Sequence, residues 1–574
     1  MRCACAVHAL SSGLRRAEPP PRPRKLKARF AFLRPARYRS LSASPHLMPD
    51  CTFYTTAIDY TNAAPHIGHA YEKVLTDVLA RYEKLRGSEV FFLTGVDQHG
   101  QKVQQSAEKE GIAPQDFADK CTAKFLDLWQ KLGVQFDGWA ATTSPTHQRV
   151  VQQILQRLHD EGQLYKQAHR GFYSVRQEQF LTDKERNEEG QFGPEWGQVV
   201  ELEEENWYFR LAQHREWLLA FIDSHEHFVI PSFRRPELRN AVERLTGDLC
   251  ISRPKSRLSW GIELPFDRHY VTYVWFDALI NYISFAGYLA LPGSDSPPFQ
   301  RLWPAKAHVI GKDILIPAHG VYWPIMLHAL GFPDDQIPSL LVHGWWNISG
   351  AKMSKSLGNA VDPVLLAERY GPGALRYYLM ADIVTGKDAD FSEERLRMRF
   401  NDELANNVGN LLNRTLNMAA RYRQGVLRRP HLSEPALAAL AEQEAPAAVA
   451  LFQQSMEQYQ VDAALRAVVG FARSCNQLIE NTAPWKLAKD PAQADLLDAV
   501  LYHLAESLRI LGILLSPVLP DAARGIHAQL QWTGGTQLSD ARWGLLPEGH
   551  LLGAPTPLFP RLEAPAAPDP EVHP

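Results

Sequence analysis

Residues 53–69 read Phe-Tyr-Thr-Thr-Ala-Ile-Asp-Tyr-Thr-Asn-Ala-Ala-Pro-His-Ile-Gly-His, and within this stretch the pattern changes from strand to helix. Its β-forming first half predicts a buried strand, and apolar residues at helical spacing predict a helix over 67–85. His66 and His69 therefore lie at a helix N-terminus, where free N–H groups and the helix dipole favour a bound phosphate. Gly68 leaves room for a ligand beside the backbone. Taken alone, the two histidines are equally compatible with an ordinary strand–helix turn.

The same alternation of strands and helices recurs along the chain and predicts an α/β fold with a Rossmann-like parallel sheet. A second strand at 89–96 ends in the polar cluster Asp97-Gln98-His99-Gly100. Open parallel sheets place their binding sites at such carboxyl ends, although a plain polar loop is the alternative. Further strands are expected at 271–276, 307–310 and 340–343.

Changes in composition divide the chain into segments. A stretch rich in helices, aromatic residues and acidic pieces interrupts the alternation and indicates an inserted domain, and no strand pattern is found after about 386. We expect a basic extension at 1–47, a catalytic domain at 48–136 and 256–385, the insertion at 137–255, a helical domain at 386–540 and a Pro-rich tail at 541–574.

The bulk numbers are those of a soluble protein with several domains. Of the 574 residues 45% are hydrophobic and 22% charged, and no stretch is apolar enough to predict a membrane span. The formal net charge is −3, but residues 1–47 carry eleven basic residues and one acid, so the rest of the chain has a net charge of −13. A nucleic-acid partner would therefore need a local basic surface. The six cysteines form no C-x-x-C pair, which favours a reducing compartment.

The segment 1–47 leaves the compartment open. It is rich in Arg and poor in acids, as transit peptides are, and it lacks the apolar core of a secretory signal. The alternative is translation from an upstream start codon, because Met48 directly precedes the first strand. We favour this alternative, since the prolines at 19–23 would interrupt an amphipathic helix. The expected location is then the cytoplasm, with a mitochondrion or plastid as the alternative.

A second motif lies far downstream, where residues 350–359 read Gly-Ala-Lys-Met-Ser-Lys-Ser-Leu-Gly-Asn. Two lysines three apart between glycines predict a cationic loop that can hold a polyphosphate and offset charge that develops at phosphorus. By itself this string is more typical of a solvated surface loop.

The two motifs together resemble the two signatures of class I aminoacyl-tRNA synthetases. Within that class the chain resembles the methionyl-tRNA synthetases over about residues 50–530, in a bacterial or organellar-like form. The segments that carry the resemblance are Thr56-Ala57-Ile58-Asp59-Tyr60, Tyr273 to Tyr282 and Gly311-Lys312-Asp313-Ile314. The resemblance implies an enzyme that joins methionine and ATP into methionyl-adenylate and then transfers methionine to tRNA(Met), including the initiator tRNA.

The resemblance also implies site residues. The methionine subsite would consist of Ala57, Ile58, Tyr60, Asp97, Trp275, Ala278, Tyr282 and His319. In it, Asp97 would bind the substrate ammonium and the aromatic rings would surround the thioether; simple core packing is the alternative for those rings. ATP, with Mg²⁺, would be held by His66, Gly68, His69, Gly311, Asp313 and Lys355. The catalytic residues would be His66 and His69, which stabilise the transition state, with Lys352 and Lys355 at the leaving pyrophosphate.

Three departures from the family pattern bear on these assignments. The chain is one residue longer than usual between Ile314 and Tyr322, which affects the alignment of His319, and Leu279 stands where many relatives have proline. In the insertion, four other residues occupy the places of the usual zinc-binding thiols, so we expect no zinc. These residues are Ser174, Gln177, Gly193 and Trp196. At about 120 residues, the insertion is also too short for the large editing domain of the leucine, isoleucine and valine enzymes.

The helical domain is expected to bind tRNA. Eight arginines and two acids lie between Arg395 and Arg429, which supplies a local basic surface. Asn476 and Trp485 resemble the family's anticodon-contacting residues, and Trp485 would stack on a base, although helix packing is its alternative role. We see no appended C-terminal tRNA-binding module and expect a monomer. Two rival functions are a small nucleotidyltransferase that uses only the first motif, and a catalytically inactive tRNA-binding paralogue.

Overall fold

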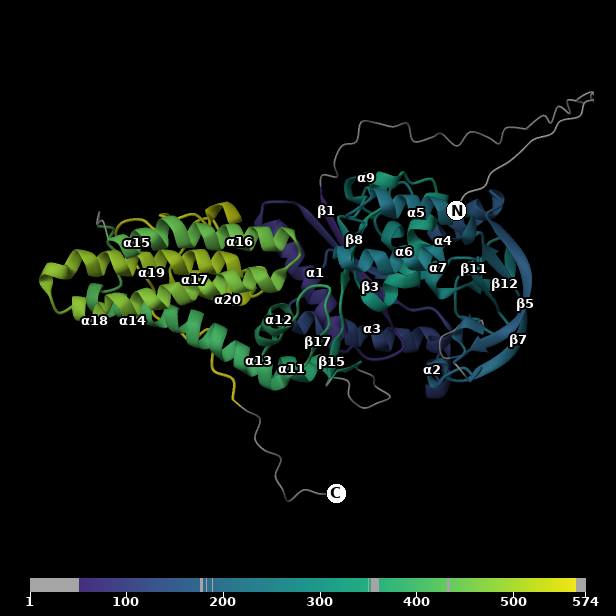
Figure 1. Ribbon diagram of the computed structural model, residues 1–574, viewed down its shortest axis with the longest axis horizontal. Helices are drawn as coiled ribbons and strands as arrows, with labels where there is room; N and C mark the ends of the chain where they lie inside the picture. Colours follow the sequence, from purple (N-terminus) through teal and green to yellow (C-terminus); the bar gives the residue numbers. More distant parts are fainter. Residues whose placement is uncertain are drawn as a thin grey trace, which may run out of the picture. The chain divides into compact units, whose positions relative to one another are not determined.

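A computed structural model describes residues 51–175, 179–181, 183–187, 189–348, 350–352, 361–430 and 434–563 (Figure 1). Within these ranges, no helix has the length and apolar character needed to cross a membrane.

A parallel sheet organises the first half of the chain and confirms the predicted fold class. Its strand order is β2-β3-β1-β13-β14-β8, and β4 pairs with β3. The strand pairs of this sheet are all parallel in the described part of the chain. The strands are β1 (Thr52–Thr56), β2 (Asp59–Tyr60), β3 (Val90–Asp97), β4 (Gly138–Ala141), β8 (Val229–Ile230), β13 (Ala307–Gly311) and β14 (Ser339–His343).

The central strands are buried almost end to end, as expected for a parallel sheet covered on both faces. All five residues of β13 are buried, and so are seven of the eight in β3. Helix α1 (Ile67–Leu85) packs against this sheet through apolar side chains at helical spacing, such as Ile67, Val74 and Val78.

Two strands of the main sheet come from the stretch expected as the insertion, because β4 and β8 both lie between residues 137 and 255. With four and two residues respectively, they are too short for a clear strand pattern. The rest of this stretch contributes to an antiparallel sheet in which β5 (Leu164–Ser174) and β7 (Val199–Phe209) form a long curved ribbon (Figure 1). The strands β6 (Gln179–Leu181) and β9 (Leu249–Cys250) flank this ribbon. A second small sheet has the order β10-β12-β11, with β10 (Ser252–Pro254), β11 (Glu263–Leu264) and β12 (Asp267–Thr272).

Ser174 and Trp196, two of the residues that replace the zinc-binding thiols, meet at one end of the ribbon. The hydroxyl of Ser174 donates a hydrogen bond to the carbonyl of Trp196 at 2.6 Å. Nearby, the guanidinium of Arg186 lies between the rings of Phe172 and Phe192, 4.8 and 4.3 Å from their centroids. Gln177 lies outside the described residues. Cation–π contacts and a short hydrogen bond thus stabilise this end of the ribbon.

Long helices dominate the second half of the chain. Helices α14 (Asn410–Arg423), α16 (Ala445–Glu457), α17 (Val461–Thr482) and α19 (Ala494–Leu515) pack against one another through buried leucines, valines and alanines (Figure 1). The expectation of no strand after about 386 is wrong in one detail. The strand β17 (Ala389–Asp390) pairs in parallel with β15 (Trp346–Ile348), and two residues cannot produce a readable strand pattern.

Candidate active site

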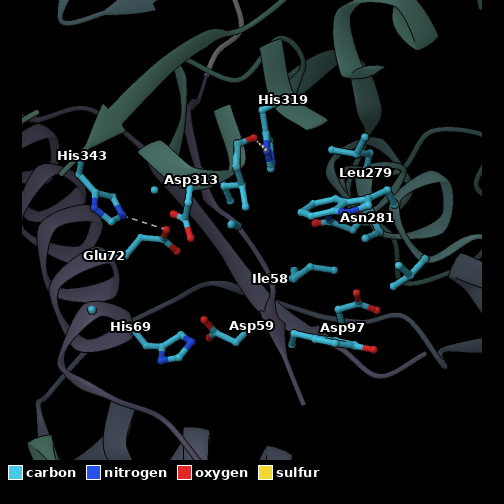
Figure 2. A pocket seen from close by; sticks show the side chains of 18 of the residues that line it. Ile58, Asp59, His69, Glu72, Asp97, Leu279, Asn281, Asp313, His319 and His343 are labelled. Carbon is cyan, nitrogen blue, oxygen red and sulfur yellow. Dashed lines mark hydrogen bonds and ion pairs between the residues drawn. The ribbon is translucent and has the colours of Figure 1, made fainter. Parts of the chain in front are cut away.

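A cavity of about 510 Å³ lies at the carboxyl ends of the central strands (Figure 2). Strands β3, β1, β13 and β14 are consecutive parallel neighbours, so the residues that follow them converge at one edge of the sheet. Residues predicted for both subsites line this cavity. The methionine set is Ala57, Ile58, Tyr60, Asp97, Trp275, Ala278, Tyr282 and His319; the nucleotide set is His66, Gly68, His69, Gly311 and Asp313.

Asp97 is the last residue of β3, and its side chain is only 6% exposed. In the parallel register between β2 and β3, Tyr60 is paired with Asp97, which places an aromatic ring beside the carboxylate. The hydroxyl of Thr142 and the backbone N–H of His99 donate to its Oδ1 over long distances of 3.4 Å each. A buried carboxylate is a strong acceptor for a cationic group, because charge-assisted hydrogen bonds are strong in a partly dry site.

His319 and Tyr282 form a buried pair on the opposite wall. The Nδ1–H of His319 donates to the carbonyl of Ile314 at 2.9 Å, and Nε2 accepts from the hydroxyl of Tyr282 at 2.7 Å. Burial lowers the pKa of His319 to about 4, so the imidazole is neutral at pH 7. This wall therefore offers aromatic surface without a charge.

The backbone around His319 is irregular. His319 belongs to the segment η6 (Leu315–Tyr322), whose helical turns are interrupted at Ile316, where the backbone is extended. His319 lines the cavity.

The two histidines of the first motif cap helix α1. The Nδ1 of His66 accepts from the backbone N–H of Gly68, and the Nδ1 of His69 accepts from the backbone N–H of His66, both at 3.1 Å. An Nδ1 that accepts carries no proton, so in the neutral ring Nε2 carries the N–H. The capping box therefore assigns the proton of each neutral ring to Nε2.

Gly311 and Asp313 follow β13 at the same edge of the sheet. A side chain at Gly311 would approach Asp313 Oδ1 to 2.7 Å, so the close turn favours glycine at this position. The indole N–H of Trp345 donates to Asp313 Oδ1 at 3.1 Å.

The second motif is described only in part. Lys352 ends the short strand β16 (Ala351–Lys352), of which only the backbone is described, and Lys355 lies outside the described residues.

A buried charged cluster in the cavity wall was missed by the sequence reasoning, and three of its members, Asp59, Glu72 and His343, line the cavity. Lys73 is fully buried and donates to Asp59 Oδ1 at 2.9 Å, to Glu72 Oε1 at 2.8 Å and to the carbonyl of Ala57 at 2.9 Å. His343 Nε2 lies 3.1 Å from the other oxygen of Glu72 (Figure 2). Burial raises the pKa of Asp59 to about 7, with Lys73 opposing the shift. The sequence analysis assigned no role to Glu72, Lys73 or His343, because contacts between groups distant in the chain leave no local pattern.

The residues predicted for tRNA do not line the cavity. Asn476 lies on α17 and donates to the carbonyl and the side-chain oxygen of Asn407 at 3.2 and 3.0 Å, so it also joins two helices. Trp485 lies on the short helix α18 (Pro484–Leu487) and is 38% exposed, with the guanidinium of Arg414 5.9 Å from its ring centroid. An exposed indole beside an arginine is available to a planar ligand.

Comparison with known proteins gives matches over almost the whole described chain. A family model described as "tRNA synthetases class I (M)" matches residues 52–190 and 196–416, and one described as "Anticodon binding domain of methionyl tRNA ligase" matches residues 433–569. The chain therefore belongs to the class I aminoacyl-tRNA synthetases, in agreement with its parallel sheet and the position of its cavity.

The relatives identify the member of that class. The methionine–tRNA ligase of Bacillus subtilis is 40% identical over 534 residues, which cover 89% of this chain and 78% of the relative. That of Deinococcus radiodurans is 40% identical over 522 residues, covering 89% and 74%. The structure of Mycobacterium tuberculosis methionyl-tRNA synthetase in complex with methionyl-adenylate superposes with a TM-score of 0.82 at 35% identity, covering 89% of this chain and all of that one. The chain is a member of the methionine–tRNA ligase family.

Proposed function

We propose that this enzyme forms methionyl-adenylate from methionine and ATP in the cavity and then transfers methionine to tRNA(Met), including the initiator tRNA. The observation that carries the proposal is that the two predicted subsites meet in one cavity at the carboxyl edge of the sheet. The methionine carboxylate would attack the α-phosphate of ATP and release pyrophosphate. The terminal ribose hydroxyl of the tRNA would then attack the methionyl carbonyl and release AMP.

Methionine is recognised by charge at one end and by apolar contact at the other. Asp97 binds the ammonium, because a charge-assisted hydrogen bond is strong in a buried site. Tyr60, Trp275 and Tyr282 surround the thioether, where sulfur–aromatic contacts contribute ~0.3–1.5 kcal/mol. The remaining members of this subsite are Ala57, Ile58, Ala278 and His319. Because His319 is neutral, the subsite does not favour a charged side chain.

ATP is held by helix α1 and the second motif. The backbone at Gly68 lets the phosphates approach, and the Nε2–H groups of His66 and His69 donate to them as charge develops at the α-phosphate. Lys352 and Lys355 stabilise the leaving pyrophosphate, and Asp313, beside Gly311, accepts from a ribose hydroxyl.

Mg²⁺ is expected to enter with ATP. Among the residues that the structure describes, no group of three His, Cys, Asp or Glu side chains has the arrangement of a metal site. We propose that the magnesium ion is held mainly by the substrate phosphates, whose charge it would neutralise. For zinc our prediction is that the purified protein contains none, and metal analysis that finds one equivalent would refute it.

The helical domain selects the tRNA. Trp485 stacks on an unpaired anticodon base and Asn476 contacts the anticodon, while the surrounding arginines hold the phosphates.

The decisive experiment is pyrophosphate exchange into ATP, with each amino acid supplied separately. Methionine-dependent exchange followed by charging of tRNA(Met) is expected. Exchange with another amino acid alone would overturn the substrate, and absence of all exchange would favour an inactive tRNA-binding paralogue. Exchange without any tRNA charging would favour a nucleotidyltransferase.

Assembly, domain limits and compartment are further proposals. We propose a monomer, to be tested by sedimentation. We also propose the domain limits 48–136 with 256–385, 137–255 and 386–540, with β4 and β8 of the second range paired into the sheet of the first, to be tested by limited proteolysis. For the compartment we propose the cytoplasm, with a mitochondrion or plastid as the alternative. Sequencing of the mature N-terminus tests this: a start at Met48 supports the cytoplasm, and a cleaved end elsewhere overturns it.

A further inference from the structure

A buried chain of polar groups lies behind the methionine half of the cavity. Asp277 Oδ2 is 2.7 Å from His99 Nδ1, Asp277 Oδ1 is 2.8 Å from His147 Nε2, and His147 Nδ1 is 2.7 Å from the hydroxyl of Ser284. Asp277 and His147 are fully buried, and His99 and Ser284 are 3% and 1% exposed. None of the four residues lines the cavity.

The ionisation of Asp277 determines which ring nitrogens of His99 and His147 donate to it. Burial alone would raise its pKa, but the charge and hydrogen bonds of His99 and His147 outweigh burial and lower it, so the carboxylate is ionised. A carboxylate only accepts, so His99 donates through Nδ1–H and His147 through Nε2–H. Two charge-assisted bonds then hold one carboxylate between two rings.

The four residues come from parts of the chain that are distant in sequence. His99 lies in the loop after β3, two residues after Asp97, and its backbone N–H donates to Asp97 Oδ1. Asp277 lies on helix α7 (Val274–Leu279), between Trp275 and Ala278 of the methionine set. His147 is on α4 (Pro145–Asp160) and Ser284 is on α8 (Asn281–Ser284). The carboxylate of Asp277 thus joins the loop that directly follows Asp97 to the helix that carries Trp275 and Ala278.

We propose that Asp277, held by His99 and His147, is a positioning residue for methionine: it sets the separation between Asp97 and the wall formed by Trp275 and Ala278. The inference rests on the proposed methionine subsite and deepens it. Asp277 does not contact the substrate. Its loss lets the two walls move apart, which weakens the binding of methionine and leaves the nucleotide half, built on α1 and β13, in place.

The primary test is Asp277→Asn in the full chain, by methionine-dependent pyrophosphate exchange. The amide has the size of the carboxylate but cannot accept from both histidines. We expect the KM for methionine to rise roughly 10- to 100-fold, the range that follows from losing a hydrogen bond to a charged group. The KM for ATP and the kcat at saturating methionine should change less than about threefold. Equal increases in the KM values for methionine and ATP, or a loss of kcat alone, would overturn the proposal.

A matched pair at His147 covers the case in which Asp277→Asn does not fold. The side-chain amide of Gln can take the place of an Nε2–H donor. His147→Gln should therefore keep the KM for methionine within about threefold, while His147→Leu raises it at least tenfold. The same KM in both variants would overturn the proposal.

Val150→Ala controls for loss of packing. Val150 is fully buried on the same helix as His147 but belongs to no polar chain. Val150→Ala should lower the melting temperature and leave the KM for methionine unchanged. If Val150→Ala raised this KM as far as His147→Leu does, any destabilisation of α4 would be enough to weaken methionine binding, and the proposal would be overturned. Exchange in the unaltered protein distinguishes failure of the proposed function from failure of this inference. If the unaltered protein shows no methionine-dependent exchange, the proposed function is refuted. If it shows normal exchange but the variants do not raise the KM for methionine selectively, only this inference is refuted.

Discussion

The two halves of the cavity are built by different means. The half proposed for methionine consists of side chains from the core, with Asp97, Tyr282 and His319 at 6%, 1% and 2% exposure. In the half proposed for the nucleotide, His66 and His69 are half-buried and Asp313 is exposed. Buried side chains are set by dense packing, whereas a helix N-terminus presents backbone donors that depend on little beyond the helix itself. Under the proposed function, selection of the amino acid would then depend on tertiary packing and binding of the nucleotide on local structure.

Asp97→Asn is expected to have the largest effect and to act on the methionine half alone. Leaving a buried ammonium without its charged partner costs about 2–5 kcal/mol, so kcat/KM for methionine should fall roughly 30- to 1,000-fold or more. The KM for ATP should stay within about threefold. Pyrophosphate exchange at varied concentrations of methionine and ATP measures both kinetic parameters. A parallel rise of the KM values for methionine and ATP would show that the two halves do not bind their substrates independently.

Lys355→Ala tests the nucleotide half, and it is expected to slow exchange without weakening the binding of methionine. Loss of a charge that acts on the developing pyrophosphate should slow exchange about 10²- to 10³-fold. Methionine affinity, measured by equilibrium dialysis without ATP, should change less than about twofold. Lys355→Arg is the control that keeps the charge. Weakened methionine binding in Lys355→Ala would mean that the two halves are coupled before ATP binds.

Burial of His319 should appear as a pH dependence of stability. Its pKa is lowered from 6.5 to about 4, so the folded state favours the neutral ring. The stability from this group is present above pH 6.5 and is lost as the pH falls toward 4, by up to about 3 kcal/mol. Urea unfolding of the unaltered protein and of His319→Asn should show a steeper loss in the unaltered protein over this range. Identical slopes would contradict a buried, neutral His319.

Trp485→Ala should have the smallest effect on activity and should leave the binding of methionine and ATP in the cavity unchanged. Loss of one stacked base costs ~1–3 kcal/mol, so the KM for tRNA should rise roughly 5- to 100-fold. Methionine-dependent exchange without tRNA should be unchanged. Trp485→Phe, which keeps an aromatic face, is the matched control. If Trp485→Ala abolished exchange, the indole would have a structural role.

Local signals predicted the parts of the molecule that local structure builds. The strand before Ile58, the helix after His66 and the polar end of β3 are visible because periodicity and turn residues encode single elements. The strands β4 and β8 were assigned to the insertion because a few residues carry no readable period, and only pairing with β3 and β14 makes them part of the main sheet.

The sequence by itself predicted the α/β fold class, the helix that begins after His66 with His66 and His69 at its N-terminus, and the resemblance that named the residues of both subsites. The strand expected at 271–276 is instead divided between β12 and the helix α7 (Val274–Leu279). Only the tertiary structure decided which distant groups meet. Asp277 is hydrogen-bonded to His99 and His147, which lie 178 and 130 positions away in the chain, and Glu72 is hydrogen-bonded to His343, which lies 271 positions away. Periodicity describes how a segment faces its neighbours, but the order of strands in the sheet selects those neighbours, and that order is a property of the whole fold.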